Sequence, residues 1–268
     1  MSDFENRVAV ITGGAAGIGR AMAHAFASRG AHLVLADIDE PALADAEAEF
    51  SGRGTEVLTV PTDVRERDSV FALADATYRA FGRAHIVCNN AGITAVGSVV
   101  GADPLDWQTT MGINFWGVVH GVDAFVPRLL EQSDGGHVVN TASMAGLTGM
   151  LGLGMYCASK FAVVGLTESL YRELRGRGVG VSVLCPMVVD TNLGMNSRRM
   201  LRKAAPEPGA GQGLLKGSVI PVEDVATRVV RAIERKDLYI FTHPEQREFL
   251  RRRANRQDAM FEDDAWSL

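Results

Sequence analysis

A tyrosine and a lysine stand four residues apart, at Tyr156 and Lys160, where a segment with helical periodicity begins. On a helix this spacing places both side chains on one face, within reach of a shared ligand. A free tyrosine has a pKa of about 10, and a nearby ammonium stabilises the phenolate and brings the group closer to neutral pH. Tyr156 is therefore predicted to be a general acid or base that takes the proton of an alcohol as hydride leaves its carbon.

A glycine-rich segment, TGGAAGIG from Thr12 to Gly19, follows the first strand-like run and precedes a helical pattern. Gly13, Gly17 and Gly19 allow a tight turn and a close approach to a pyrophosphate, whose charge is favoured by the free N–H groups at a helix start. The spacing is GxxxGxG rather than the general GxGxxG, so a plain strand-to-helix turn remains an alternative. Its place after the first strand favours a dinucleotide site.

Asp37 ends the second strand-like run, 18 residues beyond Gly19. An acidic residue about 20 residues past the glycines commonly meets the adenosine ribose. A carboxylate there accepts hydrogen bonds from ribose hydroxyls and repels a 2′-phosphate, so NAD is favoured over NADP. The alternative is that Asp37 caps the next helix, and Asp39 competes with it for either role.

Short β-rich runs alternate with longer helical patterns along the chain. The runs cover residues 8–12, 32–36, 56–60, 85–89, 137–141, 179–184 and 238–241, and the helical patterns cover 17–29, 40–50, 66–81, 104–131, 155–176 and 222–235. Several runs are nearly continuous in apolar residues, as expected where helices cover both faces of a sheet. The sequence predicts an α/β fold: one Rossmann-type, doubly wound parallel sheet of about seven strands.

No internal repeat and no Pro/Ser-rich linker divides the 268 residues, so we expect one NAD-binding catalytic domain over residues 1–268. The stretch from Pro206 to Gly217 is rich in glycine and proline and is predicted to be a loop. We expect it to belong to a substrate loop or lid near residues 190–217. A helical tail is expected near residues 244–262.

Composition argues against several classes of protein. A net charge of −5 offers no broad basic surface for nucleic acid. The longest apolar stretch, residues 144–158, is interrupted by four glycines and is shorter than the ~20 residues that span a bilayer. The start of the sequence lacks the pattern of a signal peptide, and the three cysteines form no CxxC pair, so a cytoplasmic location is expected. The six histidines show no paired spacing, so no metal is expected.

Four separate motifs resemble those of the short-chain dehydrogenase/reductase family, and the likeness extends from Arg7 to about Phe241. The segment from Thr12 to Gly19 is similar to the family's TGxxxGIG cofactor loop. Asn89-Asn90-Ala91-Gly92 is similar to its NNAG segment, and Asp63-Val64 resembles its adenine contact. The catalytic Asn-Ser-Tyr-Lys set of the family matches Asn114, Ser143, Tyr156 and Lys160, including the 13 residues from serine to tyrosine.

The resemblance implies a role for each of these residues. Ser143 would hydrogen-bond the substrate oxygen, and Lys160 would hold the nicotinamide ribose while lowering the tyrosine pKa. Asn114 would position, through its main chain, a water that connects Lys160 to solvent. Taken singly, each residue also has an ordinary structural explanation: a helix-entry cap at Ser143, a helix kink at Asn114, a surface charge at Lys160 and a half-buried ring at Tyr156.

One position departs from the family pattern. Pro186-Met187 stands where the family usually has Pro-Gly, and Val188-Val189-Asp190-Thr191 follows at the usual distance. Thr191 is still expected at the carboxamide, whereas Met187 is a candidate to shape the pocket. The expected cofactor contacts are Gly13, Gly17, Ile18, Gly19, Asp37, Asp63, Val64, Asn90, Ala91, Gly92, Tyr156, Lys160, Pro186, Val189 and Thr191.

The residues that flank the catalytic set are mostly apolar, which favours a small hydrophobic alcohol or ketone as substrate unless they fill the core. They are Leu147, Met150, Leu151, Leu153, Met187, Val188, Leu193 and Met195. Basic residues at 198, 199, 202 and 203 are candidates to attract an anionic substrate tail, or form a solvated face. A further basic run, Arg251 to Arg253 with Arg256, is expected to be a solvated face or a subunit contact.

Two other functions stay open. An NADPH-dependent carbonyl reductase would carry a basic residue in the cofactor loop or after the second strand, and Ala16 and Asp37 argue against it. A catalytically silent NAD-binding regulator would lose the proton-transfer residues, which this chain retains. The helices near 104–131 and 155–176 carry apolar residues beyond those that one sheet face needs, and the resembling family uses them as an interface. A homo-oligomer, tetramer or dimer, is therefore expected.

Overall fold

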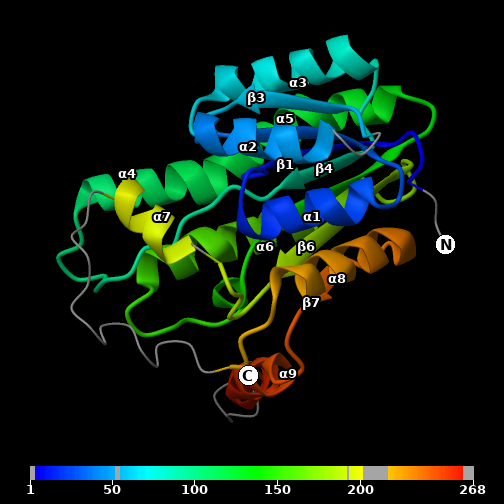
Figure 1. Ribbon diagram of the computed structural model, residues 1–268. Coiled ribbons are helices and arrows are strands. Elements are labelled where there is room, and N and C mark those ends of the chain that lie inside the picture. Colours follow the sequence, from blue (N-terminus) through cyan, green and yellow to red (C-terminus); the bar gives the residue numbers. More distant parts are fainter. Residues whose placement is uncertain (1–3, 52–54, 192, 202–216, 262–268) are drawn as a thin grey trace.

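A seven-stranded parallel sheet forms the centre of the protein in this computed structural model, which describes residues 4–51, 55–191, 193–201 and 217–261 (Figure 1). The strands lie in the order β3-β2-β1-β4-β5-β6-β7. They are β1 (Val8–Thr12), β2 (His32–Asp37), β3 (Val57–Pro61), β4 (Ile86–Asn89), β5 (Gly136–Thr141), β6 (Val179–Cys185) and β7 (Tyr239–Phe241). The predicted fold class is confirmed.

Helices cover both faces of the sheet (Figure 1). One face is covered by α1 (Gly17–Ala27), α2 (Glu40–Ser51) and α8 (Val222–Arg235), and the other by α3 (Arg67–Phe81), α5 (Gly117–Glu131) and α6 (Gly154–Glu173). Successive side chains of β1 point to opposite faces, so Ile11 packs with α1 and Val10 packs with α3. Because both faces are buried, the strand is apolar from Val8 to Ile11, and such burial produces the continuous apolar runs in the sequence.

The helical pattern over residues 104–131 is three segments rather than one helix. It comprises α4 (Pro104–Met111), the π-helical turn η1 (Gly112–Trp116) and α5. In η1 the Gly117 N–H bonds the Gly112 carbonyl, five residues back. A Cβ on Gly117 would lie 2.9 Å from the Val64 side chain, so the close approach of this helix to the β3–α3 connection requires glycine.

Two elements near the carboxyl edge were not expected from the sequence. They are the 3₁₀ turn η2 (Met144–Gly146) and the helix α7 (Leu193–Met200). The expected helical tail contains α9 (Gln246–Asp258) and η3 (Ala259–Phe261). Apart from Gly217, the predicted loop from Pro206 onward lies outside the described residues.

The strand order changes direction at β1, which pairs with β2 on one side and β4 on the other. The chain leaves β1 toward one face of the sheet and leaves β4 toward the other face. These two connections separate from each other, and a crevice opens between them at the carboxyl ends of the strands. Within the described ranges, no helix combines the length and the hydropathy required to cross a membrane.

Candidate active site

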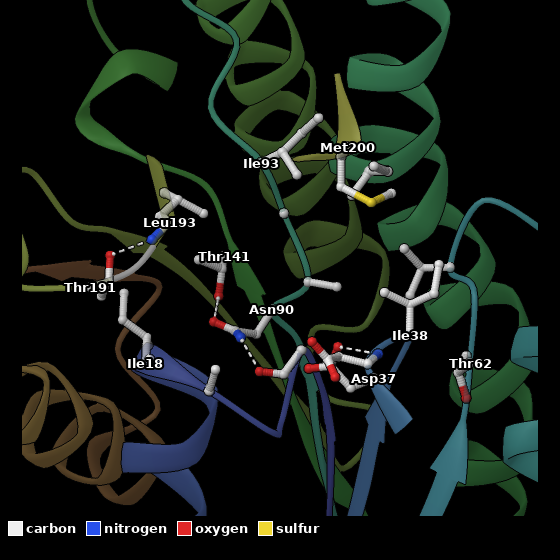
Figure 2. Close-up of a pocket in the computed structure, with 18 of the residues that line it drawn as sticks. Ile18, Asp37, Ile38, Thr62, Asn90, Ile93, Thr141, Thr191, Leu193 and Met200 are labelled. Atoms are coloured by element: carbon white, nitrogen blue, oxygen red, sulfur yellow. Dashed lines mark hydrogen bonds between the residues drawn. The ribbon is translucent and has the colours of Figure 1, made fainter. Parts of the chain in front are cut away.

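A cavity of about 540 Å³ opens at the crevice beyond β1 and β4. Figure 2 shows Asp37 at one side of this cavity, Thr191 at the other and Asn90 between them. The predicted residues that line it are Gly13, Gly17, Ile18, Asp37, Asp63, Val64, Asn90, Ala91, Gly92, Tyr156, Lys160, Pro186 and Thr191. The other predicted residues, Gly19, Asn114, Ser143 and Val189, stand outside the lining.

The glycines of the loop after β1 are required by close packing. Gly13 has φ of +64°, and a Cβ there would lie 3.0 Å from the Ala91 Cα. A Cβ on Gly19 would lie 2.0 Å from the Gly13 carbonyl oxygen, so only glycine lets α1 begin this close to the loop. Gly17 has φ of +51°, and a Cβ there would lie 3.5 Å from Cγ2 of Thr191, so these two lining residues are neighbours. The first two residues of α1, Gly17 and Ile18, line the cavity, so the start of this helix borders it, as a pyrophosphate site requires.

The segment after β4 is tied to the same loop. The Thr12 hydroxyl accepts hydrogen bonds from the backbone N–H groups of Asn90, at 2.9 Å, and Ala91, at 3.1 Å. The Asn90 side chain donates to the Thr12 carbonyl at 3.1 Å. It accepts from the Thr141 hydroxyl at 3.3 Å (Figure 2). Asn90 therefore connects the ends of β1, β4 and β5 and sets the floor of the cavity.

Of the two roles that the sequence left open for Asp37 and Asp39, the structure assigns the helix cap to Asp39. The Asp39 carboxylate accepts from the Ala42 N–H at 3.2 Å and so caps α2. The Asp37 carboxylate is the more enclosed of the two, and it accepts from the N–H groups of Ala15, at 3.3 Å, and Asp39, at 3.2 Å. Burial raises the pKa of Asp37 above its ordinary value, while these backbone donors act in the opposite direction.

Asp63 and Val64 lie on the same side of the cavity, after β3. The Arg65 guanidinium contacts the Asp63 carboxylate with Nε 3.0 Å from both oxygens, and this contact lowers the pKa of Asp63. The Val64 carbonyl lies 3.0 Å from Nδ1 of His120 on α5. These contacts hold the segment in place at the cavity wall.

Tyr156 and Lys160 lie one turn apart in α6, as predicted, with the Lys160 Nζ 5.7 Å from the centre of the tyrosine ring. Lys160 is 3% exposed, so it is no surface charge, and its Nζ donates to the Thr141 carbonyl at 2.9 Å. Ser143 caps η2 by accepting from the Ala145 N–H at 3.1 Å, and its hydroxyl donates to the Pro186 carbonyl at 3.3 Å. A structural role and a chemical role are both compatible with this geometry.

Burial governs the protonation of these groups. It raises the pKa of Tyr156 above its ordinary value, and the nearby hydroxyls of Ser143 and Thr94 offset part of that effect. It lowers the pKa of Lys160 to about 8, because burial removes the water that would solvate its ammonium. Stabilisation of a Tyr156 phenolate therefore depends on positive charge strong enough to outweigh desolvation.

Asn114 lies in the π-helical turn η1 and is fully buried. Its side-chain amide donates to the Ile93 carbonyl at 2.9 Å and to the Ser159 hydroxyl at 3.0 Å, and its side-chain oxygen accepts from the Ile93 N–H at 2.8 Å. The side chain is thus committed to the segment after β4. This arrangement leaves the predicted use of the Asn114 main chain possible, and the helical irregularity expected at this position is the π-helical turn itself.

Sequence reasoning missed Thr94 and Ser197. The Thr94 N–H donates to the Ser197 hydroxyl at 2.8 Å, and that hydroxyl donates to the Leu193 carbonyl at 2.5 Å, so α7 is fastened to the wall of the cavity. Leu193 and Met200 of α7 also line the cavity (Figure 2). Neither Thr94 nor Ser197 belongs to a motif with a recognisable spacing. The only sequence signal for this part of the cavity wall was the hydrophobic residues of α7.

The segment after β6 agrees in part with expectation. Pro186 and Thr191 reach the cavity, but Val189 forms a bridge with Ile220 and packs against the core beside α1 and α8. Met187 lies beside Gly217: a Cβ added to this glycine would be 3.1 Å from the Met187 sulfur. Met187 therefore packs against the far end of the expected loop, and it is not among the residues that line the cavity.

The apolar residues flanking the catalytic set have mixed positions. Leu147 and Leu153 pack in the core, whereas Leu151 is 90% exposed. Leu193 lines the cavity. The side chain of Met195 and the basic residues at 198, 199, 202 and 203 lie outside what the structure describes. The core-filling alternative thus holds for part of this set.

A match to a family model decides the family of this chain. Residues 7–202 match the model of the short chain dehydrogenase family. The chain belongs to that family. Among curated proteins, this short-chain dehydrogenase is 38% identical over 250 residues to 1-deoxy-11-beta-hydroxypentalenate dehydrogenase of Streptomyces exfoliatus, covering 92% of this chain and 87% of that protein. It is 34% identical over 270 residues to a CLA biosynthesis dehydrogenase/reductase of Lactiplantibacillus plantarum, covering 96% and 94%.

A solved structure agrees with the whole arrangement. The short-chain dehydrogenase/reductase of Burkholderia phymatum, in complex with NAD, superposes on this chain with a TM-score of 0.90. The two chains are 41% identical, and the match covers 97% of each. This protein is accordingly an oxidoreductase of the short-chain family with a nicotinamide dinucleotide as its cofactor class.

Proposed function

We propose that this short-chain dehydrogenase transfers hydride between NAD and a hydrophobic secondary alcohol or its ketone, with Tyr156 as the acid/base. The observation that carries the proposal is the layout of one cavity, which has the Asp37 carboxylate in one part of its lining and Tyr156 with Lys160 in another. Gly13 and Gly19 bring the loop and helix start into contact between these groups, where a pyrophosphate fits. Bound NAD⁺ would accept the hydride when an alcohol is oxidised, and bound NADH would donate it when a ketone is reduced.

The protein's own residues handle the proton. Tyr156 takes the proton of the alcohol when the substrate is oxidised, and gives it back when a ketone is reduced. Ser143, whose hydroxyl faces Tyr156, hydrogen-bonds the same substrate oxygen and fixes its position. Lys160 contributes a positive charge beside the phenolate while protonated, and its pKa of about 8 allows that near neutral pH. The main chain of Asn114 holds the water that connects Lys160 to solvent.

The choice of NAD over NADP rests on charge. The Asp37 carboxylate is partly buried and lines the cavity, and the lining carries Asp39 and Glu40 beside it. A 2′-phosphate placed here would meet like charges, whereas ribose hydroxyls would donate to Asp37. The NAD bound by the Burkholderia phymatum relative supports this choice.

A hydrophobic substrate is supported by the far side of the cavity. Ile93, Leu193 and Met200 line it, and their side chains carry no hydrogen-bond donor. The name of the Streptomyces exfoliatus relative gives a hydroxy compound as what it dehydrogenates, which supports an alcohol as the reacting group. An apolar wall with few polar groups is typical of sites for such ligands.

A screen of NAD reduction over a panel of secondary alcohols tests the proposal. We expect NADH absorbance with at least one apolar secondary alcohol and little with primary alcohols or sugars. Turnover with NADP alone would favour the carbonyl reductase instead. Tight NAD binding, measured by calorimetry, without turnover on any alcohol or ketone would favour the silent regulator.

We also propose a homo-oligomer with two-fold symmetry, dimer or tetramer. Leu105 of α4 and Trp116 of η1 are 60% and 51% exposed, and Tyr171 of α6 is 37% exposed. Large apolar side chains on these neighbouring helices are suited to burial against a second copy. Light scattering at micromolar concentration should give a mass of two or four chains, and a monomer would contradict the proposal.

A cytoplasmic location is part of the same proposal. Cys88, Cys157 and Cys185 are all buried and unpaired. Free thiols are typical of proteins in a reducing compartment. Fractionation of cells that express a tagged chain should recover it with cytoplasmic markers, and recovery with secreted protein would contradict this.

A further inference from the structure

A carboxylate on α2 holds two basic side chains of α1. Oε2 of Glu49 accepts from Nε of Arg20 at 2.9 Å and from its Nη2 at 2.6 Å. Oε1 of Glu49 lies 3.0 Å from Nε2 of His24, whose ring packs on Phe50 with centroids 4.6 Å apart. The three polar side chains are between 27% and 38% exposed. Two hydrogen bonds from one guanidinium and a third contact give Glu49 a defined position.

The same guanidinium reaches the glycine loop of the cofactor cavity. Nη1 of Arg20 donates to the Ala15 carbonyl at 3.3 Å, and the Ala15 N–H donates to the Asp37 carboxylate, also at 3.3 Å. Ala16, the next residue of the loop, lines the cavity. A single residue, Ala15, therefore links the Arg20 guanidinium to the hydrogen bond that positions Asp37.

The charges around the glycine loop indicate how the contact between Arg20 and Ala15 can affect the binding of a phosphate. Asp37, Asp39 and Glu40 line this part of the cavity, and Arg20 is the cation whose hydrogen bond reaches the loop. A guanidinium is a strong partner for a phosphate. Because Glu49 occupies Nε and Nη2 of Arg20 and cancels its charge, little of that attraction reaches the cavity.

We propose that Glu49 is a second determinant of cofactor selectivity: it holds Arg20 beneath the glycine loop and neutralises it, so that the cation does not favour the 2′-phosphate of NADP. The inference rests on the proposed use of NAD. Asp37 then acts directly on the adenosine ribose, and Glu49 acts through Arg20. Arg20 is a positioning residue that supports Ala15, and its charge is kept from the ligand by its partner.

Binding of NADH and NADPH to the intact protein tests this without a known substrate. Dissociation constants are measured from the fluorescence of the reduced nicotinamide at low ionic strength. Glu49→Gln keeps a side-chain oxygen that accepts from Arg20 but removes the charge. We expect it to shift the NADPH-to-NADH affinity ratio toward NADPH by about three- to tenfold. At about 0.5 M salt the shift should shrink, since a partly exposed charge is screened.

Glu47→Gln is the matched control. Glu47 lies on the same helix and carries the same charge, but its partner is the Thr59 hydroxyl on β3, at 2.8 Å. It should change the affinity ratio less than twofold, and thermal unfolding verifies that both variants fold. Arg20→Gln combined with Glu49→Gln restores the local charge balance and should return the ratio to near that of the wild type.

Two failures are distinguishable. If the wild type binds NADH and NADPH equally well, the proposed NAD preference is wrong, and Glu49 has no selectivity to support. If the wild type prefers NADH but Glu49→Gln and Glu47→Gln shift the ratio equally, or the double variant keeps the shift, the role of Glu49 is overturned while the NAD assignment stands.

Discussion

Titratable side chains are buried both where the parallel strands begin, here called the amino edge of the sheet, and where they end, the carboxyl edge. Their surroundings differ between the two. At the amino edge, Nε2 of His85 lies 2.9 Å from the Asp134 carboxylate. Nε2 of His137 lies 2.8 Å from the Ser182 hydroxyl, which itself donates to the Asp237 carbonyl. At the carboxyl edge, Asp37, Tyr156 and Lys160 line a cavity instead.

A shifted pKa is common to both edges. Burial lowers the pKa of His137 to about 4 and that of Lys160 to about 8. Yet neither His85 nor His137 belongs to the cavity lining. A perturbed pKa therefore marks a candidate site only together with a space in which a ligand meets the group.

The largest effect on catalysis is expected from Tyr156→Phe. This change removes the ionisable hydroxyl and keeps the ring, so kcat should fall at least 10²-fold, as expected for loss of general acid–base catalysis. Tyr78→Phe is the matched control, because the Tyr78 hydroxyl lies near the amino edge, 3.2 Å from the Gln132 side chain, and burial raises its pKa to about 12. Steady-state kinetics in which both variants keep most of the activity would contradict the mechanism.

A smaller effect, on the order of a hundredfold, is expected in cofactor preference at Asp37. The wild type should strongly prefer NAD in kcat/KM, and Asp37→Ala should shrink that preference because the repulsion of a 2′-phosphate is lost. Initial rates with both cofactors measure it. Equal use of NAD and NADP by the wild type would show that Asp37 does not meet the ribose.

The smallest effect on catalysis is expected at the amino edge, where pH acts on stability. The folded pKa of His137, about 4, lies below the ordinary value of 6.5, so the unfolded chain binds the extra proton first. The free energy of unfolding should therefore fall as pH drops below 6.5, and level off near pH 4. The difference between the two pKa values corresponds to roughly 3 kcal/mol.

Urea unfolding across this pH range measures the slope, and His137→Asn supplies the comparison. The variant should lose this contribution to the slope, while its kcat at neutral pH changes less than about twofold. An identical slope in both proteins would show that His137 titrates normally in the folded state.

Much of the fold was predictable because its strands are buried on both faces. The apolar runs gave each strand to within about one residue at either end, as for β1 and β5. The π-helical turn η1 was not predictable, since it depends on how closely Gly117 packs on Val64. The helix α7 was missed because its one described buried side chain is a serine, Ser197.

The cavity was predictable where spacing alone encodes geometry. Tyr156 and Lys160 share a helix, and the glycines share one turn, so local periodicity placed them correctly. Thr94 and Val189 differ, because their positions depend on contacts with Ser197 and Ile220 from distant segments. Such tertiary contacts leave no pattern in the neighbouring sequence.

The place of β1 in the sheet has a consequence for synthesis on the ribosome. Ala9 of β1 pairs with Ile86 of β4, 77 residues later. At about 5–20 residues per second, the ribosome takes roughly 4–15 s to deliver the second neighbour of this strand. During that interval one edge of β1 lies open while α1 and β2 can already fold on the other side. A nascent chain arrested before Ile86 should therefore be more prone to aggregation than one arrested after Asn89, since an unpaired apolar strand edge is a template for association.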